Sequence, residues 1–259
     1  TVTVITNRAF RNRGIDSVIL PSNLVTIGEK VFELNNLTTI TFPATVTSIE
    51  TDAFLNNSLS QITLNSGPEI IGENAFRGNQ LASITIPSGT VTIGQGAFSN
   101  NQLTSINLPN TLNLIDNQAF RDNQLSNIVI PTGVITLGRG AFRNNLLTSV
   151  ALPNTIETID TDAFVTNKLE SINLPNSLTT LGGGAFRDNQ LTSIAIPDGI
   201  IELESQTFRN NDLQSVTLPA NLEIIRNDVF RDNEITSIDF PASLTTLGGF
   251  SFRNNMLAS

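Results

Sequence analysis

The chain has 259 residues, of which 39% are hydrophobic, 14% charged and 6% aromatic, so it can bury a sizeable core and is neither disordered nor collagen-like. It contains no His, Cys, Trp or Tyr, which excludes disulfides, thiol chemistry and the usual zinc sites and removes the most common general bases. The net charge of −9 opposes broad attraction to nucleic acids or anionic membranes, and no apolar run is long enough to span a bilayer.

Phenylalanine recurs every 22 residues along the whole chain. Twelve of the fifteen Phe residues keep this spacing without an insertion: Phe10, Phe32, Phe54, Phe76, Phe98, Phe120, Phe142, Phe164, Phe186, Phe208, Phe230 and Phe252. A fixed period of about 20–50 residues is typical of solenoid proteins. Each repeat is therefore described from its Phe onward.

A turn and then a strand are predicted after each Phe. The third residue after Phe is Asn in eleven of twelve repeats, and Asn suits turns closed by side-chain-to-backbone hydrogen bonds. The next stretch, for example Leu103–Pro109, alternates apolar and polar residues, as a strand buried on one face does. Pro ends this strand because it cannot continue a hydrogen-bonded ladder.

A second, shorter strand and a turn complete the repeat. Thr92-Ile93-Gly94 shows the pattern, in which an apolar residue precedes a Gly that suits a left-handed turn. No stretch keeps helical periodicity for ten residues. We expect a mostly β, right-handed solenoid with little regular helix, in which like strands of successive coils stack in parallel at ~4.8 Å.

One whole repeat reads Leu103-Thr104-Ser105-Ile106-x-Leu108-Pro109, then Leu112, Ile115 and Ala119-Phe120. This pattern resembles the BspA-like leucine-rich repeats of bacterial surface proteins, and the resemblance covers essentially the entire chain. That family usually carries Cys in the turn before the strand, within a slightly longer unit, where this chain carries Asn. The resemblance implies a leucine-rich-repeat horseshoe or arc that is secreted or displayed at the cell surface and binds host or neighbouring-cell surface or matrix proteins.

The chain is predicted to be a single solenoid over residues 1–259, with about twelve repeats. It begins and stops inside a repeat, and neither end has the polar cap that terminal repeats normally carry. We expect an excerpt of a longer protein, with its signal peptide, caps and anchor outside it. Uncapped ends also allow end-to-end self-association.

Three columns of the predicted strand point outward, six, seven and nine residues after Phe, and they consist mainly of Ser and Thr. In solenoids this inner face is the usual binding surface. We expect specificity where the columns deviate from Ser and Thr, at Asn107, Asn127, Glu170, Asn173, Gln214 and Asp239. The predicted function is a non-enzymatic protein-binding or adhesion module that needs no cofactor or metal and has no catalytic residues.

Other interpretations remain open at this point. The repeats suit a structural spacer or self-assembling rod, and the Thr and Ser ladders suit ice binding. An Arg column directly after Phe either grips an anionic polymer or pairs locally with the Asp that follows it. Carboxylate pairs such as Asp160-x-Asp162 either bind Ca²⁺ weakly or occupy turns that Asp tolerates as Gly does.

Three Phe residues lie outside the regular spacing. Phe42 and Phe240 fall in an apolar strand column and are expected in the core. Phe250 takes a turn position, and we expect it to form an exposed contact or to pack under further repeats.

Overall fold

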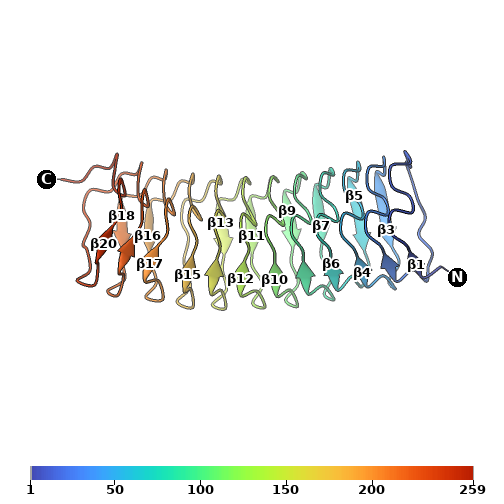
Figure 1. Ribbon diagram of the computed structural model, residues 1–259, viewed down its shortest axis with the longest axis horizontal. Coiled ribbons are helices and arrows are strands. Elements are labelled where there is room, and N and C mark those ends of the chain that lie inside the picture. The colour runs from blue at the N-terminus through green and yellow to red at the C-terminus, as the bar shows by residue number, and fades with distance from the viewer. Residues whose placement is uncertain (1, 259) are drawn as a thin grey trace. The chain divides into compact units, whose positions relative to one another are not determined.

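The computed structural model describes residues 2–258, and the chain divides into two compact units, Thr1–Leu125 and Ser126–Ser259. Each unit is a stack of coils with one 22-residue repeat per coil (Figure 1). No residue that the structure describes is helical. The expected mostly β solenoid of stacked, short parallel strands is therefore confirmed, and no described segment is a helix that could cross a membrane.

In the first unit the strands form two kinds of ladder. The two-residue strands pair in parallel, each with the strand one repeat away, in the order β1 (Val4–Ile5), β2 (Thr26–Ile27), β4 (Ser48–Ile49), β6 (Ile70–Ile71), β8 (Thr92–Ile93) and β10 (Leu114–Ile115). The longer strands form two separate pairs, β3 (Thr39–Phe42) with β5 (Gln61–Leu64) and β7 (Ser83–Thr85) with β9 (Ser105–Asn107). Residues pair with those one repeat on, as Thr39 with Gln61.

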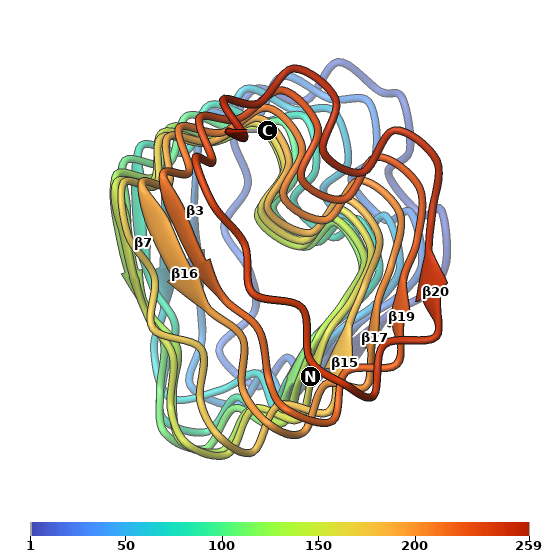
Figure 2. The ribbon, with the colours of Figure 1, turned by 90° about the vertical axis from the view of Figure 1, so that its left-hand side faces the viewer.

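The second unit repeats this arrangement. Its longer strands pair as β11 (Asn127–Val129) with β13 (Ser149–Ala151) and β16 (Ser193–Ala195) with β18 (Ser215–Thr217). Its two-residue strands pair as β12 (Thr136–Leu137), β14 (Thr158–Ile159) and β15 (Thr180–Leu181), and as β17 (Glu202–Leu203), β19 (Ile224–Ile225) and β20 (Thr246–Leu247). In this unit β16 lies on one side of the coil and β17, β19 and β20 on the other (Figure 2).

A spine of Phe rings forms the centre of the core. Rings of successive repeats stack nearly parallel, as Phe54 and Phe76 do at 5.4 Å between centroids and 8° between planes. The spine rings from Phe32 to Phe230 are 0% exposed. Phe10, which stacks on Phe32, is 41% exposed, so the spine is fully covered only in the inner repeats.

The core prediction holds for Phe42 and is wrong for Phe240. Phe42 packs its edge against two spine rings, Phe54 at 5.4 Å and Phe76 at 6.0 Å, and is 1% exposed. Phe240 meets one spine ring, Phe252, at 5.7 Å and stays 45% exposed. The ring that contacts two spine rings is therefore buried, and the ring that contacts one is not.

A buried Asn column holds the turns in place. Ten of these Asn residues are buried, and Asn101 shows what they do. Its Nδ2 donates to the carbonyl oxygens of Phe98 in its own coil (3.1 Å) and of Phe76 in the preceding coil (2.9 Å), while its Oδ1 accepts the Leu81 N–H (3.1 Å). The predicted side-chain-to-backbone bonds are confirmed, and they also join neighbouring coils.

The Gly that follows the two-residue strand of a repeat has a different role from the one expected. Gly94 does not have a positive φ; a Cβ there would come within 3.0 Å of the Glu73 nitrogen in the preceding coil. The left-handed residue lies two positions later, at Gly96 (φ +61°). Close packing between coils, and not turn conformation, therefore favours Gly at this column.

Candidate functional site

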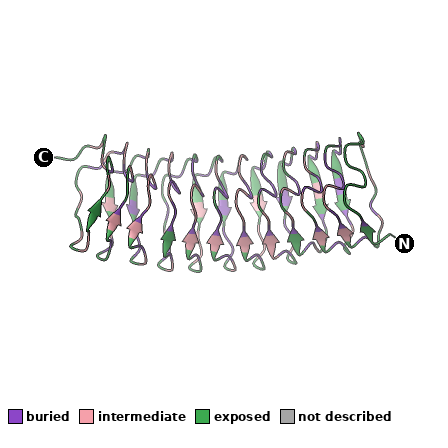
Figure 3. Cartoon of the chain, in the orientation of Figure 1, coloured by how far each residue is buried: buried purple, intermediate pink, exposed green. Residues whose placement is uncertain are grey.

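The longer strands carry the outward-facing columns, which together are called the strand face below. Along β7, Ser83 and Thr85 are exposed while Ile84 is buried, so the hydroxyl groups point to solvent and the apolar residue to the core. Figure 3 shows this alternation as green and purple segments of the strands. It follows from the period of two in a β-strand, and it confirms that these columns lie on the surface.

All six predicted partner-binding residues are exposed. Asn107 ends β9 and Asn127 begins β11, whereas Glu170, Asn173, Gln214 and Asp239 lie on coil segments without an assigned strand.

Two of these six residues, Glu170 and Gln214, are connected through backbone hydrogen bonds to Thr192, which lies between them. The Thr192 N–H donates to the Glu170 carbonyl (3.3 Å), and the Gln214 N–H donates to the Thr192 carbonyl (2.9 Å). The Gln214 side chain donates in turn to Glu234 (3.3 Å). No hydrogen bond joins any two of the six directly in the described part of the chain.

A shallow hollow of about 500 Å³ lies on the strand face of the first unit, over β5, β7 and β9. Its polar side chains are Ser60, Gln61, Thr63, Ser83, Thr85, Ser105 and Asn107. Asn107 is the one predicted residue among them. The sequence shows the columns that form this hollow but not the hollow itself, because its depth depends on how neighbouring coils pack.

Two exposed, large apolar residues occur in the strand-face column that lies nine residues after Phe. Ile19 is 97% exposed and Val129 is 70% exposed. Sequence reasoning assigned them no role. The signal that could have found them is a β-branched apolar residue in a column of Thr, Ala and Asn.

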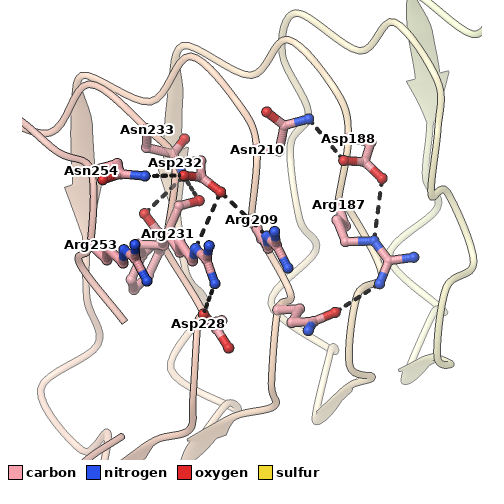
Figure 4. Close-up of polar contacts among 12 residues, drawn as sticks. Arg187, Asp188, Arg209, Asn210, Asp228, Arg231, Asp232, Asn233, Arg253 and Asn254 are labelled. Atoms are coloured by element: carbon pink, nitrogen blue, oxygen red, sulfur yellow. Dashed lines mark hydrogen bonds and ion pairs between the residues drawn. The ribbon is translucent and has the colours of Figure 1, made fainter. Parts of the chain in front are cut away.

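The Arg column lies beside carboxylates. In the second unit, Arg187 Nε lies 3.3 Å from Asp188, and Asp232 lies 3.4 Å from the Nε atoms of both Arg209 and Arg231 (Figure 4). Such half-exposed pairs contribute little to stability. They do neutralise the Arg side chains locally, which confirms the local-pairing interpretation for these repeats.

Two carboxyl groups, Asp232 in the Arg column's cluster and Glu29 beside Lys30, have a shifted pKa. The pKa of Asp232 is lowered mainly by a hydrogen bond from Asn254 (2.6 Å), and also by Arg231 and Arg209, against an opposing effect of burial. The pKa of Glu29 is lowered mainly by a hydrogen bond from Lys30 (2.7 Å). Both groups lie away from the strand face, so neither shift marks a catalytic acid or base there.

Asp residues that directly follow a two-residue strand accept a hydrogen bond from the backbone N–H of the next residue. Asp116 Oδ1 accepts the Asn117 N–H (2.6 Å), and Asp160 Oδ1 accepts the Thr161 N–H (2.5 Å). Neither has a positive φ, so the expectation that Asp replaces Gly there in a left-handed turn is wrong, whereas Asp162 (φ +57°) does adopt that conformation. Among the residues described, no three carboxylates are grouped so that they could hold a metal ion.

Comparisons with known proteins agree with this architecture. The family model described as "BspA type Leucine rich repeat region" matches in six copies, over residues 3–126, 52–168 and 135–258. No curated protein sequence matches the chain.

Several solved structures are similar. The pneumococcal vaccine antigen PcpA gives a TM-score of 0.69 at 19% identity, covering 99% of this chain and 76% of that protein. A leucine-rich repeat protein from Bacteroides ovatus gives 0.58 at 20% identity (98% and 80%), and a leucine rich cell surface protein from Faecalibacterium prausnitzii gives 0.55 at 21% identity (97% and 79%). At these identities the likeness shows the fold alone.

Proposed function

Because this chain belongs to the BspA-type leucine-rich repeat family, we propose that it is a non-enzymatic protein-binding module of an adhesin. Its partner is a host or neighbouring-cell surface or matrix protein, contacted through the strand face. The observation that carries the proposal is that the strand face exposes three columns made mainly of hydrogen-bonding side chains.

Within this proposal, the six residues that break the Ser and Thr columns confer specificity. Asn107, Asn127, Asn173 and Gln214 supply amide groups, and Glu170 and Asp239 supply the charges. All six side chains are exposed. The strand face has no Trp or Tyr to serve as an anchor, so we expect contact over an extended polar area.

The proposed location is extracellular or at the cell surface of a bacterium. The supporting observations are the family and the names of two similar structures, a leucine rich cell surface protein and a pneumococcal vaccine antigen. Surface labelling of intact source cells, followed by detection of the labelled chain, tests this location.

The binding proposal is tested by a pull-down from extracellular-matrix and cell-wall fractions, followed by a saturation measurement with the captured protein. The test variant is Asn107→Ala/Glu170→Ala/Asn173→Ala. A matched control, Asn113→Ala/Glu157→Ala/Asn176→Ala, removes the same residue types from exposed positions outside the three columns. We expect saturable binding that the test variant loses and the control keeps. Equal binding by both variants would refute a role for the strand face.

A second candidate, end-to-end self-association, is favoured by exposed apolar residues in the last described coils. Phe240, Leu247 and Phe250 are 45%, 51% and 64% exposed. If these residues mediate association, sedimentation velocity will show a mass that rises with concentration, and Phe250→Asp will abolish the rise. A concentration-independent monomer would exclude this candidate.

A further inference from the structure

The hollow over β5, β7 and β9 is lined by hydroxyl groups that are free to bind a ligand. The side chains of Thr63, Ser83, Thr85 and Ser105 are exposed and make no hydrogen bond to another described residue. By contrast, the Ser60 hydroxyl at the rim donates to the Thr38 carbonyl (3.3 Å). Each free hydroxyl offers one donor and two acceptor lone pairs.

The backbone ladder is interrupted inside the same hollow. β3 pairs with β5, and β7 pairs with β9, but β5 and β7 belong to different two-stranded sheets. The Thr104 N–H donates to the Ala82 carbonyl (2.9 Å), whereas the Ala82 N–H has no such bond to the coil before it in the described structure. The interruption separates two of the strands that line the hollow, although Ala82 itself is not one of the lining residues.

The surroundings of the hollow carry no charge. Residues 78–115 contain no Asp, Glu, Lys or Arg, and neither do residues 53–68, although the whole chain has a net charge of −9. A ligand in the hollow therefore meets no ionic group from the strands that line it. An ionic ligand would lose its hydration there without gaining a counter-charge.

The lining also disfavours apolar ligands and a peptide with a large hydrophobic anchor. Ile84 and Leu64 lie beneath the surface, 6% and 8% exposed, and no aromatic residue lines the hollow. Sites for apolar ligands are lined mainly by hydrophobic and aromatic side chains, and protein hot spots fill well-packed pockets. Neither description fits this hollow.

We propose that the hollow is a binding site for a neutral glycan, which uncharged hydroxyl and amide groups recognise by hydrogen bonds. A sugar ring presents several hydroxyl groups that, like Ser and Thr, both donate and accept. The volume, about 500 Å³, lies within the range of about 300–1,000 Å³ that is usual for ligand sites. Each of β5, β7 and β9 presents two uncharged hydrogen-bonding side chains to the hollow, Gln61 and Thr63, Ser83 and Thr85, and Ser105 and Asn107, so successive sugars of a polymer each find hydroxyl or amide partners.

This inference adds a ligand class to the proposed protein-binding function and uses different residues. Only Asn107 belongs both to the hollow and to the predicted protein-binding set. The test below leaves Asn107 unchanged, so that the two proposals can fail separately.

The test is affinity electrophoresis of the whole chain in native gels that contain dextran, mannan, galactan or, as an anionic comparison, heparin. The hollow variant is Thr63→Val/Ser83→Ala/Thr85→Val/Ser105→Ala, which removes hydroxyl groups and keeps side-chain shape. The matched control, Thr192→Val/Ser193→Ala/Ser215→Ala/Thr217→Val, makes the same changes at exposed strand-face positions of the second unit. Thermal unfolding of each variant confirms that it is folded.

We expect a neutral polysaccharide, and not heparin, to retard the chain. The dissociation constant should rise by about tenfold or more in the hollow variant and stay unchanged in the control. The glycan proposal is overturned if no neutral polysaccharide retards the chain, or if the hollow variant is retarded as strongly as the wild type. Binding of a matrix protein that the hollow variant loses, without retardation by any polysaccharide, also overturns it and leaves the protein-binding function intact.

Discussion

In ten of the coils a single buried Asn gives hydrogen-bond partners to backbone groups that no strand satisfies. Asn101 bonds two Phe carbonyls and the Leu81 N–H, and the last of these has no other acceptor in the described structure. Buried polar groups left without a partner cost about 1–3 kcal/mol each. The Asn column is thus a structural requirement of the fold and contributes no group to the strand face.

Replacing Asn101 with Ala should therefore lower the free energy of unfolding by about 1–3 kcal/mol, because the Leu81 N–H loses its acceptor, whereas the Phe76 and Phe98 carbonyls keep Asn79 and Asn123 as donors. Asn110→Ala, at an exposed position of the same repeat, should change it by less than about 0.5 kcal/mol. Urea titrations of both variants measure the difference. Equal stability of the two would mean that the buried bonds contribute nothing.

The Asp232 carboxyl links pH to stability. Its pKa lies below the ordinary value of 3.8 because Asn254 donates to the ionised form. A lowered carboxyl pKa stabilises the fold above the unfolded-state pKa, and this contribution is lost as the pH falls through the folded-state pKa.

An Asn254→Ala variant should raise the pKa of Asp232 toward its ordinary value, as measured by carboxyl ¹³C chemical shifts during an acid titration. Asn210→Ala serves as the control, since Asn210 donates to Asp188 (2.9 Å) in the same way. If the control moved the pKa of Asp232 as much as Asn254→Ala does, the hydrogen bond would not be its cause.

At the scale of strands and coils, the sequence predicts position well and pairing less well. The period of two and the Pro that follows locate the longer strands. The short strand predicted around Thr92-Ile93 is β8, as expected. The interruptions of the longer ladder were not predicted. The Ser60 and Thr104 N–H groups donate to the coil before them, whereas the Ala82 N–H does not. These three residues differ in type, but the alternation that predicts the strand is the same in their repeats, so it carries no signal for the interruptions.

Amide hydrogen exchange measures this interruption directly. Ala82 and Thr104 occupy the same column in adjacent repeats and are both exposed, but only the Thr104 N–H is bonded. We expect the Ala82 amide to exchange clearly faster than that of Thr104. Equal protection of the two amides would indicate a continuous ladder between β5 and β7.

The Phe spine supports each coil from within. Phe142 is 0% exposed and stacks on Phe164 at 5.5 Å, so Phe142→Ala should cost about 3–5 kcal/mol. Phe250 is 64% exposed, with Arg253 over its ring at 5.5 Å, and Phe250→Ala should cost less than about 1 kcal/mol. Thermal denaturation of both variants compares them. A cost below about 1 kcal/mol for Phe142→Ala would mean that the spine does not hold the core.

At the scale of the molecule, composition and register together determine where binding is expected. All six predicted residues lie on the surface, because the period of two decides which side chains face outward. Whether these residues form one binding surface does not follow from the sequence, since Asn107 lies in the first unit and the other five in the second. The hollow also escaped prediction, because it arises from the packing of three coils and from no single motif.

The central claim is that partners bind on the strand face. The most direct measurement is hydrogen–deuterium exchange of the whole chain, free and in complex with a captured partner. The account predicts that slowed exchange on binding is confined to segments of the strand face, such as 104–107 and 170–173. Slowed exchange confined to the two-residue strands on the other side of the coil, such as β8 and β14, would contradict it.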